Sequence, residues 1–97
     1  MAKIQVVADA ESMLDIVETA IASERKRLKI GLDSTQKKIT EFERKHGRSS
    51  SEFLSKMRAE DLNGGDEEYV AWAGELKIRQ RILEDIEKLQ NVEYVAR

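Results

Sequence analysis

One apolar stripe, repeated every seven residues, limits what this chain can fold into. Leu14, Ile21, Leu28, Thr35 and Phe42 follow one another at that spacing. Positions seven apart lie on the same side of an α-helix, because seven residues make almost two turns. The stripe keeps its phase from residue 14 to residue 42 and predicts one long helix over about residues 9–46.

The ends of this helix also carry sequence signals. Asp9 is a plausible N-cap, and Gly47 suits the left-handed residue that follows a helix C-terminus. Gly31 costs about 1 kcal/mol relative to alanine inside a helix, so two helices over 9–30 and 34–46 are the alternative. The unbroken phase of the stripe favours a single helix.

Two more helices are expected after Gly47. Ser49 and Glu52 have the spacing of a capping box, which predicts a short helix over about residues 50–61. The sequence Asn-Gly-Gly-Asp at 63–66 is a loop signal, and its aspartate is placed to cap a last helix over about residues 67–93. We expect one helical domain over residues 1–97.

The apolar faces of the two long helices are wide, about half of the circumference. Two helices cannot bury two such faces on each other alone. The sequence therefore predicts an all-α long helical hairpin with a short corner helix, which pairs into a dimeric antiparallel bundle or coiled coil. The residues predicted at the interface are Leu14, Val17, Ile21, Leu28, Trp72, Leu76, Ile78, Ile82, Leu83, Ile86 and Leu89.

Two short apolar segments, at residues 4–7 and 92–95, fall outside the strong helical pattern. Extension of the neighbouring helices is the expected outcome. Local pairing of the two segments and docking on another protein are the alternatives.

Composition excludes several classes of protein. The chain has 17 basic residues, 19 acidic residues and no cysteine, so disulfides and thiolate metal sites are impossible. No run of 18 apolar residues is present, so no membrane-spanning segment is predicted. Asp9 interrupts the first apolar stretch before it reaches the length of the apolar region of a secretory signal peptide, so no signal peptide is predicted. The expected location is the cytoplasm, with no membrane partner.

A metal site is the sharpest enzymatic alternative. Glu43 and His46 form a Glu-x-x-His motif, which occurs in ferritin-like di-iron bundles. A dimer supplies two copies, and Glu75, Glu84 and Asp85 are available for the remaining ligands. The competing interpretation is a histidine that is favourable at a helix C-terminus. We predict no cofactor and keep Glu43 and His46 as weak metal candidates.

Nucleic-acid binding is the third possibility. Residues 24–48 carry nine bases against four acids. Their only aromatic residue, Phe42, belongs to the apolar stripe, and the net charge of the chain is −2, whereas nucleic-acid binders are usually basic. We expect the basic helix to pair with the acidic helix instead. The serines at 49–51 fit a capping run, and no catalytic residue is predicted.

The stretch FERKHGRSSSEFLSKMRAEDLNGGDEEYVAWAG, residues 42–74, resembles a pattern in small prokaryotic all-helical proteins that are antitoxin-like partners of small toxin-like proteins. The matching positions are Phe42, Lys45, Gly47, Ser49, Glu52, Phe53, Gly65, Asp66, Tyr69, Trp72 and Gly74. The chain departs from the pattern at His46, where tyrosine is commoner, and in an extra Asn-Gly at 63–64. The resemblance implies a binding role and transfers no catalytic residue.

These observations together predict a non-enzymatic protein-interaction module that forms a homo-oligomer, a dimer first, and that acts as the antitoxin-like member of a pair. A metal-binding helical bundle and a nucleic-acid-binding helical protein remain the alternatives.

Overall fold

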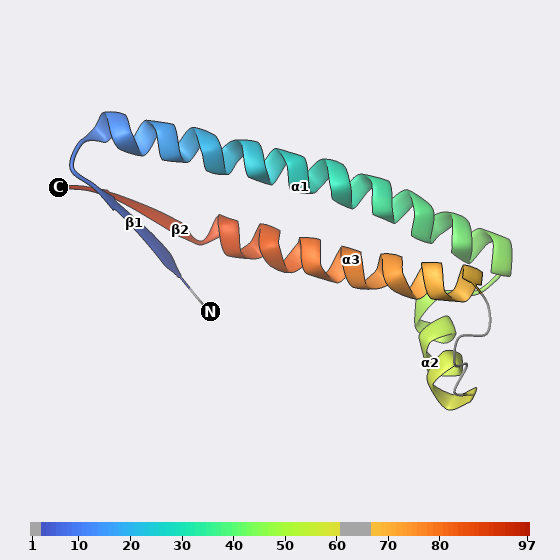
Figure 1. Cartoon of the computed structure of the whole chain (residues 1–97). Helices are drawn as coiled ribbons and strands as arrows, with labels where there is room; N and C mark the ends of the chain where they lie inside the picture. The colour runs from blue at the N-terminus through green and yellow to red at the C-terminus, as the bar shows by residue number, and fades with distance from the viewer. Residues whose placement is uncertain (1–2, 61–66) are drawn as a thin grey trace. The chain divides into compact units, whose positions relative to one another are not determined.

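The computed structural model describes residues 3–60 and 67–97, in the order strand, three helices, strand (Figure 1). The elements are β1 (Ile4–Ala8), α1 (Glu11–His46), α2 (Ser50–Glu60), α3 (Glu67–Gln90) and β2 (Val92–Ala96). Helix α1 has 36 residues and is continuous through Gly31, which confirms the single long helix. It begins at Glu11, and the carbonyl of Ala10 accepts the N–H groups of Met13 and Leu14. The predicted N-cap, Asp9, therefore lies one residue before the cap position.

Two paired strands correct the all-α prediction. The terminal segments do not extend the helices, but form a parallel pair with Ile4 opposite Val92 and Ala8 opposite Ala96. Both segments are rich in β-branched side chains, whose restricted rotamers favour extended backbone over helix. Local pairing, the alternative reading of these segments, is what the structure shows (Figure 1).

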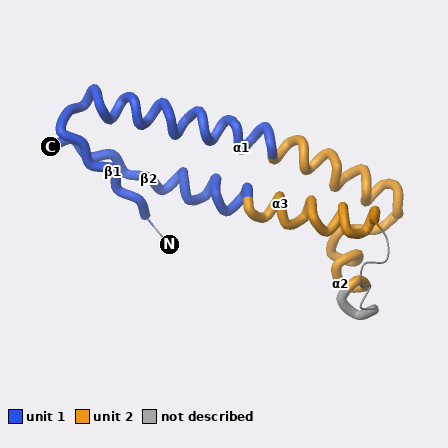
Figure 2. The backbone as a smooth tube through the Cα atoms, viewed as in Figure 1, with its two compact units in different colours: residues 1–31, 82–97 blue, residues 32–81 orange. Residues whose placement is uncertain are grey.

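The chain divides into two compact units, each of which contains part of α1 and part of α3 (Figure 2). Unit 1 comprises Met1–Gly31 and Ile82–Arg97, and includes both strands. Its buried side chains are Leu14, Leu28 and Ile86. The two helices of this unit approach each other at Gly31, where an added Cβ would lie 3.5 Å from Cδ1 of Ile82, an ordinary van der Waals contact.

Unit 2 comprises Leu32–Arg81 and contains all of α2. Its core is a cluster of Ile39, Phe53, Trp72 and Leu76. The side chains that pack around this cluster are Phe42, Leu54, Met57, Tyr69 and Ala73. One residue or more from each of the three helices is therefore held in a single core.

The corner between α1 and α2 follows its sequence signals. Gly47 has a φ of 61°, and the N–H of Arg48 donates to the carbonyl of Glu43 at 3.3 Å, which is the six-residue bond of a Schellman motif. The N–H of Glu52 donates to Oγ of Ser49 at 3.2 Å, so the predicted cap of α2 is confirmed. The predicted loop at 63–66 and its capping aspartate lie outside the described residues.

Candidate functional site

The core of unit 2 is centred on Trp72. Trp72 is fully buried and stacks on Phe53, with ring centroids 4.0 Å apart. Its Nε1 donates a hydrogen bond of 3.0 Å to Oγ of the buried Ser50. A buried indole needs such a partner for its N–H. Trp72 therefore fastens α3 to α2 and offers no surface to a ligand.

The weak metal candidates have structural contacts in the same corner. Oε2 of Glu43 accepts the N–H of Ser50 at 2.9 Å, at the start of α2. The ring of His46 stacks on Trp72 and meets Tyr69 edge-on, each at 5.4 Å between centroids. Nε2 of His46 is buried without a hydrogen bond and lies 3.6 Å from Oε2 of Glu68, beyond hydrogen-bonding distance.

The other acids of the metal hypothesis do not complete a ligand set. Glu75 accepts a hydrogen bond from the buried hydroxyl of Thr35 and pairs with Lys38. Glu84 and Asp85 belong to unit 1, whereas Glu43 and His46 belong to unit 2. Over residues 3–60 and 67–97, no three His, Cys, Asp or Glu side chains gather in a metal-binding arrangement.

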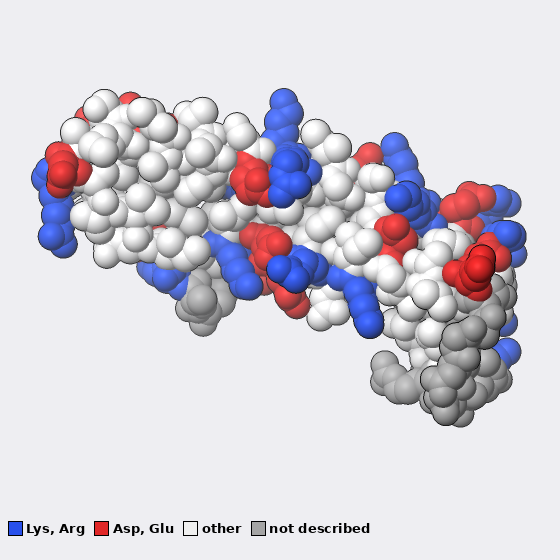
Figure 3. All heavy atoms as spheres, in the orientation of Figure 1, with Lys and Arg blue, Asp and Glu red and all other residues white. Residues whose placement is uncertain are grey.

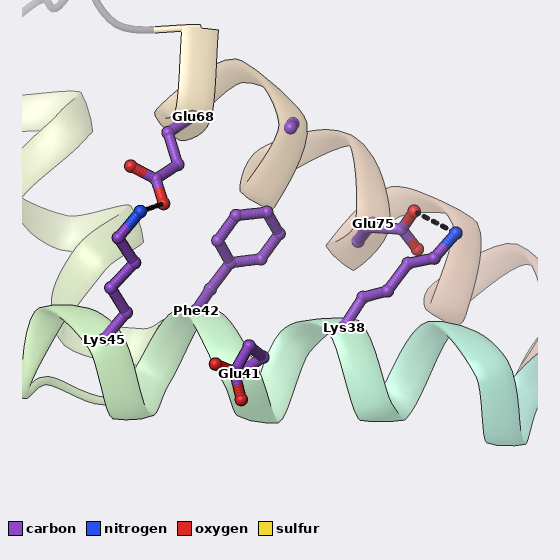
Figure 4. Close-up of a pocket in the computed structure, with 7 residues that line it drawn as sticks. Lys38, Glu41, Phe42, Lys45, Glu68 and Glu75 are labelled. Atoms are coloured by element: carbon purple, nitrogen blue, oxygen red, sulfur yellow. Dashed lines mark ion pairs between the residues drawn. The ribbon is translucent and has the colours of Figure 1, made fainter.

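A charged groove of about 390 Å³ lies between α1 and α3 in unit 2. Its lining residues are Lys38, Glu41, Phe42 and Lys45 from α1, and Glu68, Ala71 and Glu75 from α3. Nζ of Lys45 lies 2.6 Å from Oε1 of Glu68, and Nζ of Lys38 lies 3.6 Å from Oε1 of Glu75. Figure 4 shows the ring of Phe42 between these two ion pairs. The two lysines and the two glutamates are each seven residues apart, so the pairs repeat along the helices.

This pairing engages much of the basic segment. At least five of its nine bases form ion pairs, with Arg27, Lys37 and Arg44 bonded to acids on their own helix. Lys38 and Lys45 reach α3, as the sequence predicted for a basic helix against an acidic one. The groove is thus bridged by opposite charges and presents no continuous cationic surface to a phosphate backbone.

Unit 1 has a different surface, an apolar groove of about 360 Å³. It is lined by Val6, Val7, Ala8, Asp9, Met13, Ile16 and Val17. Three of these side chains are large, apolar and open to solvent: Val7 is 44% exposed, Met13 53% and Ile16 72%. On the face drawn in Figure 3, uncharged side chains gather over the first part of α1, whereas both signs of charge are intermixed over unit 2. We call these seven residues the unit 1 groove.

The predicted interface residues divide into three groups in the structure. The buried members already pack inside the single chain; they are Leu14, Leu28, Trp72, Leu76 and Ile86. Val17, Ile21, Ile82 and Leu89 are half-buried. Ile78 and Leu83 keep 49% and 48% of their surface exposed. Met13 and Ile16 are the most exposed large apolar residues of the unit 1 groove. They were not among the predicted interface residues, although the wide apolar face of the early helix was the signal for them.

The edges of the sheet are a second feature that the helical interpretation missed. Within the described residues the sheet has two strands, so each strand has one edge without a neighbouring strand. The β-branched residues of 4–7 and 92–95 were the available signal. Strand edges of this kind are sites where another chain can add.

No protein-family model, curated protein or solved structure matches this chain. The antitoxin-like pattern of residues 42–74 therefore stays a prediction from the sequence. In the described part of the chain, no helix has both the length and the apolar character needed to cross a membrane.

Proposed function

We propose that this chain is a non-enzymatic protein-interaction module that associates with a second copy of itself and acts as the antitoxin-like member of a protein pair. The observation that supports self-association is the unit 1 groove. Its side chains Val7, from β1, and Met13 and Ile16, from α1, are all exposed to solvent. The antitoxin-like role rests on the sequence pattern of residues 42–74.

Exposed apolar side chains are common singly, but a contiguous group is typical of an interaction surface. Full burial of a side chain such as isoleucine or methionine is worth about 1.5–3 kcal/mol. Contact of Met13 and Ile16 with a partner therefore supplies a substantial part of the free energy of a micromolar complex, which is about 8 kcal/mol. The charged groove of unit 2 lacks this gain, because its lysines and glutamates are already paired.

Self-association is tested by sedimentation equilibrium of the full chain. The concentration range is about 1 to 100 µM, which covers the dissociation constants expected for a micromolar complex. We expect a dimer that Ile16→Asp weakens at least about tenfold. Ile30→Asp is the matched control, because Ile30 is 64% exposed on the same helix but does not line the groove. A chain that stays monomeric over this range, or equal effects of both substitutions, would contradict the proposal.

The antitoxin-like role needs a separate test in cells. The product of an adjacent gene is expressed with and without this chain, and growth is followed. We expect growth arrest by the neighbour's product alone, relief on coexpression, and a complex of the two proteins on size-exclusion chromatography. A neighbour whose product leaves growth unchanged removes the antitoxin-like role and leaves self-association standing.

A further inference from the structure

The backbone hydrogen bonds of the sheet determine which groups of β1 face outward. The N–H of Ile4 donates to the carbonyl of Asn91 at 3.3 Å, and the N–H of Arg97 donates to the carbonyl of Ala8 at 2.9 Å. In a parallel pair, alternate residues direct their N–H and C=O groups to the same neighbouring strand. Ile4, Val6 and Ala8 therefore bond to β2, and the backbone groups of Gln5 and Val7 point to the open edge.

The open edge of β1 lacks the features that usually prevent a strand edge from pairing with another chain. Charged side chains, prolines and bulges commonly block an edge, but β1 has the sequence Ile-Gln-Val-Val-Ala, with no charge and no proline. A two-stranded sheet is marginal by itself, and parallel sheets are usually covered by further structure. The outward groups of Gln5 and Val7 are thus suited to pair with another strand.

We propose that β1 pairs antiparallel with β1 of a second copy about a two-fold axis at Val6, so that two sheets join into one of four strands. The proposal rests on the self-association proposed above and names its surface and register. A two-fold axis requires residue i to lie opposite residue j and residue j opposite residue i. With Val6 on the axis, Gln5 lies opposite Val7 of the other copy, and these residues exchange both of their outward backbone hydrogen bonds.

Charge complementarity supports this register. Beyond the strand ends, the same pairing places Lys3 opposite Asp9 of the second copy, twice by symmetry. Opposite residues of an antiparallel pair have their side chains on one face, and Asp9 lies in the bend that directly follows β1. Lys3 is already held on that face, because its Nζ lies 2.8 Å from Oε1 of Glu93. Asp9 does not serve as the helix cap, and it lines the unit 1 groove.

Other registers and the other edge fit less well. An axis at Gln5 or at Val7 keeps the outward groups aligned, but pairs fewer residues of the strand and does not bring Lys3 to Asp9. On β2, an axis at Tyr94 brings no opposite charges together. An axis at Val95 places Glu93 opposite Arg97, but it pairs only residues 94–96 of the strand, whereas the axis at Val6 pairs all five residues of β1. The β1 edge is also continuous with the unit 1 groove, which Val7 lines.

Proline substitution tests the edge without breaking the intrachain sheet. Val7→Pro removes an outward N–H and leaves the bonds to β2 in place, because these come from Ile4, Val6 and Ala8. Proline also keeps an apolar side chain at this position of the unit 1 groove. Ala96→Pro is the matched control, since it removes an outward N–H from the opposite edge of the sheet. By sedimentation equilibrium of the full chain, we expect Val7→Pro to raise the dimer Kd at least about tenfold and Ala96→Pro to leave it unchanged. Circular dichroism checks that both variants keep the helical signal of the parent.

The outcomes separate this proposal from the one on which it rests. A dimer that Val7→Pro and Ala96→Pro affect equally overturns pairing through β1 and leaves self-association through the groove intact. A wild-type chain that is monomeric overturns both.

Charge reversal tests the register. In a Glu93→Gln background, which frees Lys3 from its intrachain partner, Lys3→Asp and Asp9→Lys each place like charges opposite each other in a homodimer. Mixed together, the two variants place opposite charges at both pairs. We expect each variant alone to dimerise about tenfold more weakly than the background and the mixture to recover the affinity as a heterodimer. A mixture that associates no better than its components overturns the register.

Discussion

The indole ring of Trp72 lies parallel to the phenyl ring of Phe53, with 4.0 Å between the centroids and 1° between the planes. The two residues are 19 positions apart and belong to α3 and α2. Phe42 and His46 of α1 stack beside the same indole, at 5.8 and 5.4 Å. One side chain therefore joins three helices.

Ser50→Ala tests the hydrogen bond that orients Trp72. Loss of the hydroxyl leaves the buried indole N–H without a partner, which costs about 1–3 kcal/mol. We expect a lower free energy of unfolding by urea and a changed tryptophan fluorescence, and Ser51→Ala, at an exposed position, serves as the control. In a Trp72→Phe background the Ser50→Ala change should cost much less, because no indole N–H remains. Equal costs in both backgrounds would contradict the role of this bond.

Three glycines should respond to alanine in opposite directions. Gly31 and Gly74 lie inside helices, and an added Cβ meets Ile82 at an ordinary 3.5 Å in the first case and nothing within 4 Å in the second. Alanine at either position should raise the free energy of unfolding by about 0.5–1 kcal/mol. Gly47→Ala should lower it by about 1 kcal/mol, because the φ of 61° is strained for any residue with a Cβ. Chemical denaturation measures all three, and stabilisation by Gly47→Ala would refute the assigned Schellman turn.

The pH response of α1 follows from its exposed ion pairs. A hydrogen bond from Arg27 lowers the pKa of Glu24, and one from Arg44 lowers the pKa of Glu41. A carboxylate with a lowered pKa contributes stability above its unfolded pKa, and that contribution is lost as the pH falls through the folded pKa. We expect NMR titration of Arg27→Gln to show a raised pKa for Glu24 and an unchanged pKa for Glu41. A shift of both carboxylates would show that the two pairs are not independent.

His46→Phe separates the structural role of this ring from the metal alternative. Phenylalanine keeps the aromatic packing between Tyr69 and Trp72 and removes the buried Nε2 that has no hydrogen bond. We therefore expect an unchanged or higher melting temperature. If a ferritin-like di-iron site exists, elemental analysis of the purified wild-type chain will show stoichiometric iron, manganese or zinc, and the His46→Phe variant will lose it.

Local signals account for much of what the sequence predicted correctly. The heptad from Leu14 to Phe42 gave α1, and Gly47, Ser49 and Glu52 gave the turn into α2. These signals act within one or two turns of helix, so neighbouring residues suffice to identify them. The predicted ends differed at two places: α1 begins at Glu11, after a cap at Ala10, and α3 ends at Gln90, because β2 begins at Val92.

Periodicity did not identify the strands, although their β-branched residues were a signal for extended backbone. Five residues from each end of the chain make the sheet, and a segment as short as Ile4–Ala8 has no period that distinguishes a strand from the continuation of a helix. The hydrogen bonds that make extended backbone favourable come from Val92–Ala96, which lies some 88 positions later in the sequence and pairs with Ile4–Ala8. The unit 1 groove depends on the same pairing, because β1 provides Val6, Val7 and Ala8 to it.

By itself, the sequence determined that the chain forms long helices with a short one at the corner, because helix hydrogen bonds, caps and apolar stripes are local. Only the tertiary structure decided which apolar residues are buried within the single chain and which stay exposed. Trp72 and Leu76 are enclosed because α2 packs over them, whereas Met13 and Ile16 have no element above them among the described residues. Burial depends on contacts between segments that are distant in the sequence. The unit 1 groove, on which the proposed function rests, could therefore be identified only from the tertiary structure.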